Sequence, residues 1–202
     1  MPIPSLLLAL ALDAALPSTH LVLTFLPAAS GRPALAPGVI DAAVREAADI
    51  WSPYRVVVDR TLPCASEPDE AVVLTVRSGA TPAAAADARP VALGAINFLE
   101  DGTPASVVTV FLDRLQRLIA AERLGDVAQD RWPAEMRQRA VGRALGRVIA
   151  HEIGHYLLGL RGHRSTGLMR ATPRAGELFN PSRNGFNLSA SDVRLLARSA
   201  AR

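Results

Sequence analysis

The feature that most constrains this chain is the stretch His151-Glu152-Ile153-Gly154-His155. On a helix, two histidines four residues apart lie on one face, close enough to bind the same metal ion. The chain contains four histidines, and three of them, His151, His155 and His163, fall within one short segment. The pattern therefore predicts a helix that carries a metal site, with His163 as the third ligand.

The residue types at this site indicate hydrolytic chemistry. A zinc ion lowers the pKa of its water to about 7, and a neighbouring carboxylate can take the proton as general base while the water attacks a polarised carbonyl. Glu152, beside the first histidine, can reach that water without being a ligand. A structural zinc site is usually closed by four protein ligands and needs no base. The sequence predicts Zn²⁺ as the cofactor and Glu152 as the catalytic residue.

Residues 151–169, HEIGHYLLGLRGHRSTGLM, resemble the zinc site of the metzincin metallopeptidases, including their methionine-containing turn. The matrix-metalloproteinase-like branch is the most similar, because its third histidine is also soon followed by a small residue, Leu and Met. Residues 188–193 (LSASDV) resemble the start of that branch's closing helix. The resemblance implies a zinc endopeptidase that acts on a peptide or protein substrate. It also implies that Met169 forms a hydrophobic floor beneath the metal and that Gly159 lies at the helix exit.

The spacing departs from the family pattern at one point. The pattern places a glycine three residues and a histidine six residues after the second histidine. Here Gly159 lies four residues and His163 eight residues after His155. One alternative is a zinc peptidase of another lineage in which Glu177, the only glutamate after Glu152, replaces His163 as a ligand. A second alternative is a non-catalytic, zinc-stabilised binding domain.

The remaining sequence predicts a mixed α/β (α+β) fold. A length of 202 residues suits one domain with a sizeable core. Apolar runs and apolar residues at helical spacing predict strands at 20–26, 54–59, 71–77, 91–99 and 106–112, and helices at 39–51, 113–124, from about 133 through the metal motif, and after Ser189. The expected fold is a twisted, largely parallel five-stranded sheet. It packs on a helix from the N-terminal half and on a long active-site helix, as the zincin-like resemblance also implies.

Four local expectations concern the surroundings of the metal motif. On the long helix, Val141, Ala144 and Val148 fall in the same sector as the two histidines and are expected to pack against the sheet. Arg143 stands to the side and is expected to be solvated. Residues 171–185, rich in Pro, Gly and Asn, are expected to form a loop that shapes the substrate pocket. By analogy with metzincins, residues 92–98 are expected to form the edge strand above the cleft, and an ordinary hairpin with a bulge is the alternative.

Composition argues against several other partners. The 22 basic residues are all arginine and the net charge is only +3, without an arginine cluster interleaved with aromatic residues, so nucleic-acid binding is not expected. The apolar run at residues 3–12 is too short to span a bilayer, so stable membrane insertion is not expected. Cys64 is the only cysteine, which precludes an intramolecular disulfide, and it is expected to be a plain loop or half-buried thiol.

The N-terminus gives a mixed targeting signal. Residues 3–12 are apolar enough for a signal-peptide core, but no basic residue precedes them and Asp13 interrupts the pattern. A cleaved or truncated export signal, an N-terminal helix without a lipid anchor and a disordered tail are all compatible with this pattern. Export, to the periplasm or the medium, is slightly favoured. Residues 1–18 are therefore assigned to a signal-like or flexible segment and residues 19–202 to the catalytic domain.

Overall fold

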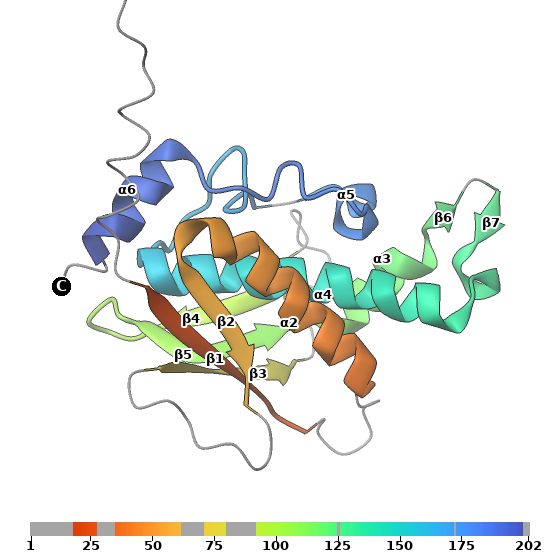
Figure 1. The fold of residues 1–202 in the computed structure, drawn as a ribbon, viewed down its shortest axis with the longest axis horizontal. Helices are drawn as coiled ribbons and strands as arrows, with labels where there is room; N and C mark the ends of the chain where they lie inside the picture. The colour runs from red at the N-terminus through yellow and green to blue at the C-terminus, as the bar shows by residue number, and fades with distance from the viewer. Residues whose placement is uncertain are drawn as a thin grey trace, which may run out of the picture.

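The computed structural model describes residues 18–27, 35–61, 71–79, 92–124, 126–171 and 173–199. Expectations for the segment 1–17 and for Cys64 lie outside the described residues. The elements follow one another as β1 (Thr19–Phe25), α2 (Pro37–Trp51), η1 (Ser52–Tyr54), β2 (Val56–Arg60), β3 (Val72–Ser78), β4 (Gly94–Phe98), β5 (Pro104–Val110), α3 (Leu112–Ala120), β6 (Arg123–Leu124), β7 (Val127–Ala128), η3 (Gln129–Arg131), α4 (Ala134–Leu158), α5 (Ala175–Phe179) and α6 (Ala190–Ser199). Figure 1 shows α2 and α4 crossing over the sheet, with the segment that carries α5 and α6 beyond α4.

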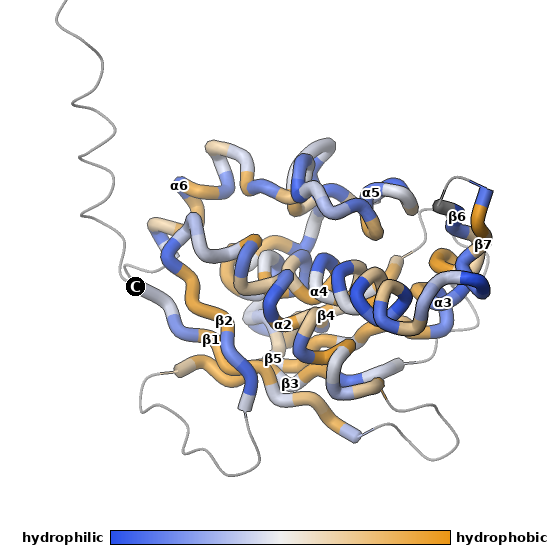
Figure 2. The backbone as a smooth tube through the Cα atoms, turned by 45° about the vertical axis from the view of Figure 1, so that its right-hand side comes forward, coloured by the Kyte–Doolittle hydropathy of each residue, from blue (hydrophilic) through white to orange (hydrophobic). Residues whose placement is uncertain are grey.

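The sheet has five strands in the order β2-β1-β3-β5-β4. The first four pair in parallel, and β4 pairs with β5 in the antiparallel sense. In β2, Val56 and Val58 are buried while Val57 is exposed, the period-two pattern of a strand with one face on the core. The central strands are also the most continuously hydrophobic part of the chain in Figure 2. The predicted largely parallel five-stranded sheet with two main helices is confirmed.

Small residues allow α2 and α4 to pack closely. A Cβ added to Gly142 of α4 would overlap the Cβ of Ala42, and one added to Gly146 would lie 2.5 Å from the carbonyl oxygen of Ala43. Real Cβ atoms are hardly ever found so near another atom, so both positions require glycine at this distance between the helices. The close contact fixes α4 against α2, and with it the metal motif in the last turns of α4.

The predicted apolar stripe of α4 is buried. Ala144 and Val148 belong to the core, together with the fully buried Leu145, Ile149 and Ile153, whereas Val141 is only half-buried and packs against the core. Because this stripe continues into the metal motif, the packing that holds α4 in place also fixes the direction in which the histidines point. Among the described helices, none offers a stretch long and apolar enough to cross a bilayer.

Replacing Ile149 by Asp should unfold the domain. The side chain is completely buried, and an unpaired carboxylate in such a place costs several kcal/mol, comparable with a total stability of about 5–15 kcal/mol. The matched control is Met136→Asp on the same helix, where the side chain is 41% exposed and the change should stay within about 0.5 kcal/mol. Urea unfolding followed by circular dichroism measures both. If the two variants were equally stable, the orientation of α4 described here would be wrong.

Two expectations about local structure are wrong. The helix expected at 113–124 ends at Ala120, because Arg123–Leu124 pairs instead with Val127–Ala128 in a short hairpin. The segment expected to be all loop at 171–185 contains the one-turn helix α5. That turn is stabilised by a hydrogen bond from the Arg174 backbone N–H to the Glu177 carboxylate at 2.8 Å. The helix start was not predicted because arginine is not among the residue types usually found at the N-cap of a helix.

Candidate metal centre and cleft

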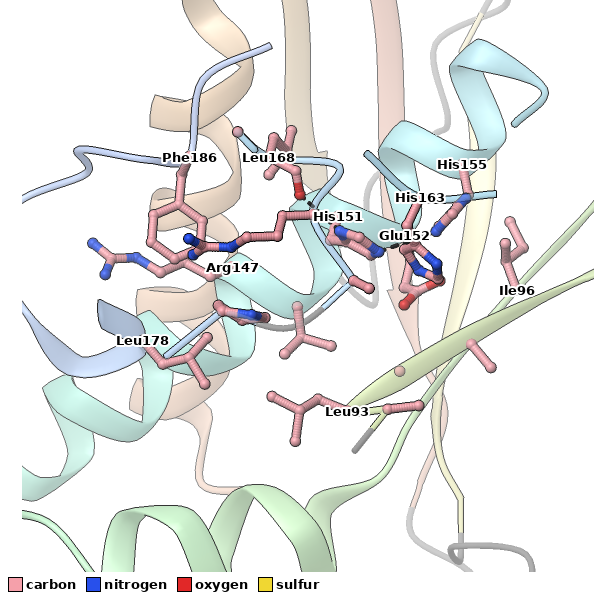
Figure 3. A pocket seen from close by; sticks show the side chains of 18 of the residues that line it. Leu93, Ile96, Arg147, His151, Glu152, His155, His163, Leu168, Leu178 and Phe186 are labelled. Atoms are coloured by element: carbon pink, nitrogen blue, oxygen red, sulfur yellow. Dashed lines mark hydrogen bonds between the residues drawn. The ribbon is translucent and has the colours of Figure 1, made fainter. Parts of the chain in front are cut away.

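Three histidines meet at the end of α4. His151 and His155 project from the helix, which ends at Leu158. Gly159 follows in the left-handed conformation (φ 60°), and the chain returns to bring His163 to the same place (Figure 3). One ring nitrogen from each histidine lies within 4.8 Å of the other two, and the Nε2 atoms of His151 and His155 are 3.0 Å apart. Nitrogens that bind one zinc tetrahedrally are about 3.3 Å apart. The three side chains could therefore hold one metal ion.

The hydrogen bonds of the rings favour the metal-binding form. The Nδ1 of His151 lies 2.7 Å from the carbonyl oxygen of Leu168, and the Nδ1 of His155 lies 2.5 Å from that of Leu160. A carbonyl only accepts, so each Nδ1 carries the proton and each Nε2 keeps its lone pair for a ligand bond. Burial lowers the pKa of His151 to about 4 and also lowers the pKa values of His155 and His163. Neutral imidazoles of this kind are what a zinc ion requires.

The extra residues between His155 and His163 lie partly in the last turn of α4 and partly in the loop after Gly159. Residues 156–158 continue the helix before the Gly159 bend, and residues 160–162 then carry the chain back. The position after His163 is fixed from two sides. The Arg164 backbone N–H donates to the Met169 carbonyl at 2.8 Å, and the Arg164 Nε donates to the buried Asp192 carboxylate of α6 at 2.9 Å. The closing helix therefore helps to hold the third histidine in place.

Met169 packs against α4 at Gly154, the residue before His155. It is fully buried, and a Cβ added to Gly154, which lies between the two helical histidines, would overlap the Met169 sulphur. The turn is anchored by the Leu168 N–H, which donates to the Asn187 carbonyl at 2.8 Å. Met169 thus packs against the metal-motif helix at Gly154, and Gly159 follows the last residue of that helix.

Glu152 points to the edge of the sheet. Its side chain is 4% exposed, and this burial raises its pKa to about 8. A Cβ on Gly94 of β4 would lie 2.7 Å from the Glu152 Oε1, so the carboxylate lies directly against the backbone of that strand. Strand β4 is at the end of the sheet, as expected for residues 92–98. An extended chain laid along β4 would therefore run past Glu152.

A cleft of about 340 Å³ extends from the histidines between β4, α4 and the segment after Met169. In Figure 3 Leu93 and Ile96 lie on the β4 side of the cleft, while Leu178 and Phe186 lie on the opposite side. The acidic and basic side chains that line it, apart from the histidines, are Glu152, Arg147, Arg161 and Arg170. The cleft is thus largely apolar with a surplus of basic side chains.

Two arginines of α4 bind the 177–182 segment, which forms the wall of the cleft opposite β4. The sequence did not predict this role. Arg143 was expected to be solvated, but it is half-buried and donates to the Phe179 carbonyl at 2.6 Å. Arg147 pairs with the buried Glu46 of α2 at 2.8 Å and also donates to backbone carbonyls of the 177–182 segment. These partners are 30 to 101 residues apart in sequence, so no local pattern reveals them.

Glu177 does not join the histidines. Among the described residues, the group able to share a metal consists of His151, His155 and His163. The Glu177 carboxylate is instead bound to the Arg170 guanidinium at 2.6 Å and to the backbone of Arg174.

Comparison with known proteins gives a likeness at the level of structure. No protein-family model matches the chain, and no curated protein matches it. Archaemetzincin from Methanopyrus kandleri is similar over 92% of this chain and 97% of its own, with 17% sequence identity and a TM-score of 0.52. The GM1-bound form of the ECX AB5 holotoxin is similar over 91% of this chain and 71% of that chain, with 17% identity and a TM-score of only 0.31. The chain therefore has the archaemetzincin fold, a mixed α/β domain with a mostly parallel five-stranded sheet.

Proposed function

We propose that this chain is a zinc-dependent endopeptidase of the metzincin type. The observation that carries the proposal is the convergence of three neutral imidazoles beside a buried glutamate, in a cleft bordered by an edge strand. His151, His155 and His163 would hold the zinc ion. When bound, zinc acidifies a water molecule and polarises the carbonyl of the scissile peptide bond.

The other steps fall to residues of the chain. The Glu152 carboxylate accepts the proton of the attacking water and then delivers it to the leaving amine. The ionised form of this carboxylate would be favoured by a zinc ion held by the three histidines, against the burial that raises its pKa. Strand β4 offers its backbone to an extended substrate, and Gly94 lets that substrate approach Glu152 closely. Met169 holds the floor of the site in place through packing.

An intact base beside an open cleft speaks against a purely structural metal site. Such a site usually has four protein ligands and no vacant coordination position. Here the group able to share a metal, among the described residues, has three members. Three histidines that leave one position for water match the ligand number of catalytic zinc sites.

Metal removal tests the proposal. The purified chain should bind about one zinc ion and cleave an unstructured peptide. Dialysis against a strong chelator should remove both the metal and the activity. Stoichiometric Zn²⁺ should restore them, whereas Mg²⁺, which prefers oxygen ligands, should not. Far-UV circular dichroism of the stripped protein checks that the fold persists. Peptide cleavage that continued at full rate without metal would refute the proposed function.

A further inference from the structure

Of the three arginines that line the cleft, Arg147 and Arg170 differ in how many of their N–H donors have a protein acceptor. All three side-chain nitrogens of Arg147 have protein acceptors. Its Nε donates to the Glu46 carboxylate at 2.8 Å, and its two terminal nitrogens donate to the carbonyls of Glu177 and Ser182. The Arg147 side chain is completely buried and its guanidinium lies over the Phe186 ring. Arg147 therefore has a structural role in the cleft wall, and none of its side-chain nitrogens is left without an acceptor.

Arg170 has donors to spare. Its Nη2 donates to the Glu177 carboxylate at 2.6 Å, but its Nε is buried and has no hydrogen-bond partner among the described residues. A guanidinium offers five N–H donors, and a buried donor without an acceptor is costly. The Nε itself is shielded by the protein, but the Arg170 side chain as a whole is 24% exposed and lines the cleft, so an acceptor brought in by a ligand can reach the terminal nitrogens of its guanidinium.

The backbone of Arg170 is fixed relative to the metal centre. Arg170 directly follows the buried Met169, its N–H donates to the Gly167 carbonyl at 3.2 Å, and it forms a β-bridge with Arg164, the neighbour of His163. The same cavity reaches both the histidines and Arg170. A side chain next to the reacting peptide bond can therefore enter the part of the cleft that Arg170 borders.

The charges of the cleft favour an anionic guest. Arg147, Arg161 and Arg170 line it, whereas the counter-ions Glu46 and Glu177 do not, and Glu152 at the metal centre is the acidic lining residue. A carboxylate accepts two parallel hydrogen bonds from a guanidinium, a match that an amide or an aliphatic group cannot make. We propose that Arg170 makes the cleft selective for peptides with a glutamate or aspartate beside the scissile bond. This inference rests on the proposed peptidase function.

Cleavage of matched peptides tests the selectivity. One peptide carries Glu, Gln, Leu or Lys in turn at each of the two positions that flank the scissile bond. At one of them the wild-type chain should show a kcat/KM about 10–100-fold higher for Glu than for the isosteric Gln, the range expected of a hydrogen bond to a charged group. Arg170→Met should bring the Glu-to-Gln ratio close to one, and Arg170→Lys should leave an intermediate ratio. Arg139→Met, which removes an exposed arginine elsewhere on α4, should keep the wild-type ratio.

Binding separates failure of this inference from failure of the function. The zinc-loaded Glu152→Ala variant is titrated calorimetrically with the same Glu and Gln peptides, so that selectivity is read without turnover. Tighter binding of the Glu peptide, lost when Arg170→Met is added, supports the inference even if cleavage is slow. Equal cleavage and equal binding of Glu and Gln peptides would overturn the acidic selectivity and leave the peptidase proposal standing. If no peptide is cleaved or bound, both proposals fail.

Discussion

Replacing Glu152 by Ala should lower peptide hydrolysis about 10²–10⁴-fold, the usual contribution of a general base, while the zinc content stays near one ion per chain. The carboxylate is not among the groups that would share the metal, and the hydrogen bonds that orient His151 and His155 come from backbone carbonyls. Metal binding should therefore survive the substitution. Because burial raises the pKa of Glu152 to about 8, the metal-free fold disfavours its charge, and loss of the carboxyl is not expected to unfold the chain.

Two further variants test whether the lost activity is due to the missing proton acceptor. Glu152→Gln keeps the shape of the side chain but cannot accept the proton, so it should be as inactive as Glu152→Ala. Glu135→Ala, which removes a 75% exposed glutamate from the same helix, should leave hydrolysis unchanged. Zinc content is measured by atomic absorption and turnover with a fluorogenic peptide. A zinc-loaded Glu152→Ala protein with wild-type turnover would show that another group is the base.

Most of the fold could be predicted because its signals are local. The alternation that buries Val56 and Val58 is visible in five residues, and the apolar stripe of α4 is visible at helical spacing. The strand–helix–strand order of β1, α2 and β2 then leaves few arrangements for a parallel sheet. The elements that were missed, α5 and the β6–β7 hairpin, are short, and contacts rather than periodicity decide them.

In the candidate site, too, the features with a local sequence signal could be predicted and those that depend on long-range contacts could not. The closeness of His151 and His155 follows from helix geometry alone. The return of His163 depends on the Gly159 bend and on the Arg164–Asp192 ion pair, which joins residues 28 positions apart. The roles of the cleft arginines could not be predicted from the sequence, because an arginine in a chain whose basic residues are all arginine carries no distinguishing local signal.

The second large effect concerns the third ligand. His163→Ala should weaken zinc binding strongly and abolish hydrolysis, whereas Glu177→Ala should keep its zinc and continue to cleave the peptide. His163 shares the metal-binding group with the two helical histidines, and partial burial lowers its pKa, which favours the neutral form that binds metal. The Glu177 carboxylate is engaged by Arg170 and the Arg174 backbone. With two ligands left, a zinc site loses the coordination that a catalytic centre requires.

The two variants are compared after dialysis against a weak chelator, which strips a two-ligand site but not a three-ligand site. Zinc retained per chain is the primary measurement, and cleavage of a peptide with uncharged residues at the scissile bond is the second, because such a peptide does not depend on Arg170. His20→Ala serves as control, since His20 pairs with Asp59 at the far edge of the sheet and its loss should not change the zinc content. If Glu177→Ala lost the metal while His163→Ala retained it, the metzincin proposal would fail in favour of a lineage with a carboxylate ligand. The fold predicts the opposite order, because the Gly159 bend, the Arg164–Asp192 ion pair and the turn at Met169 all bring His163, and not Glu177, to the face of α4 that carries His151 and His155.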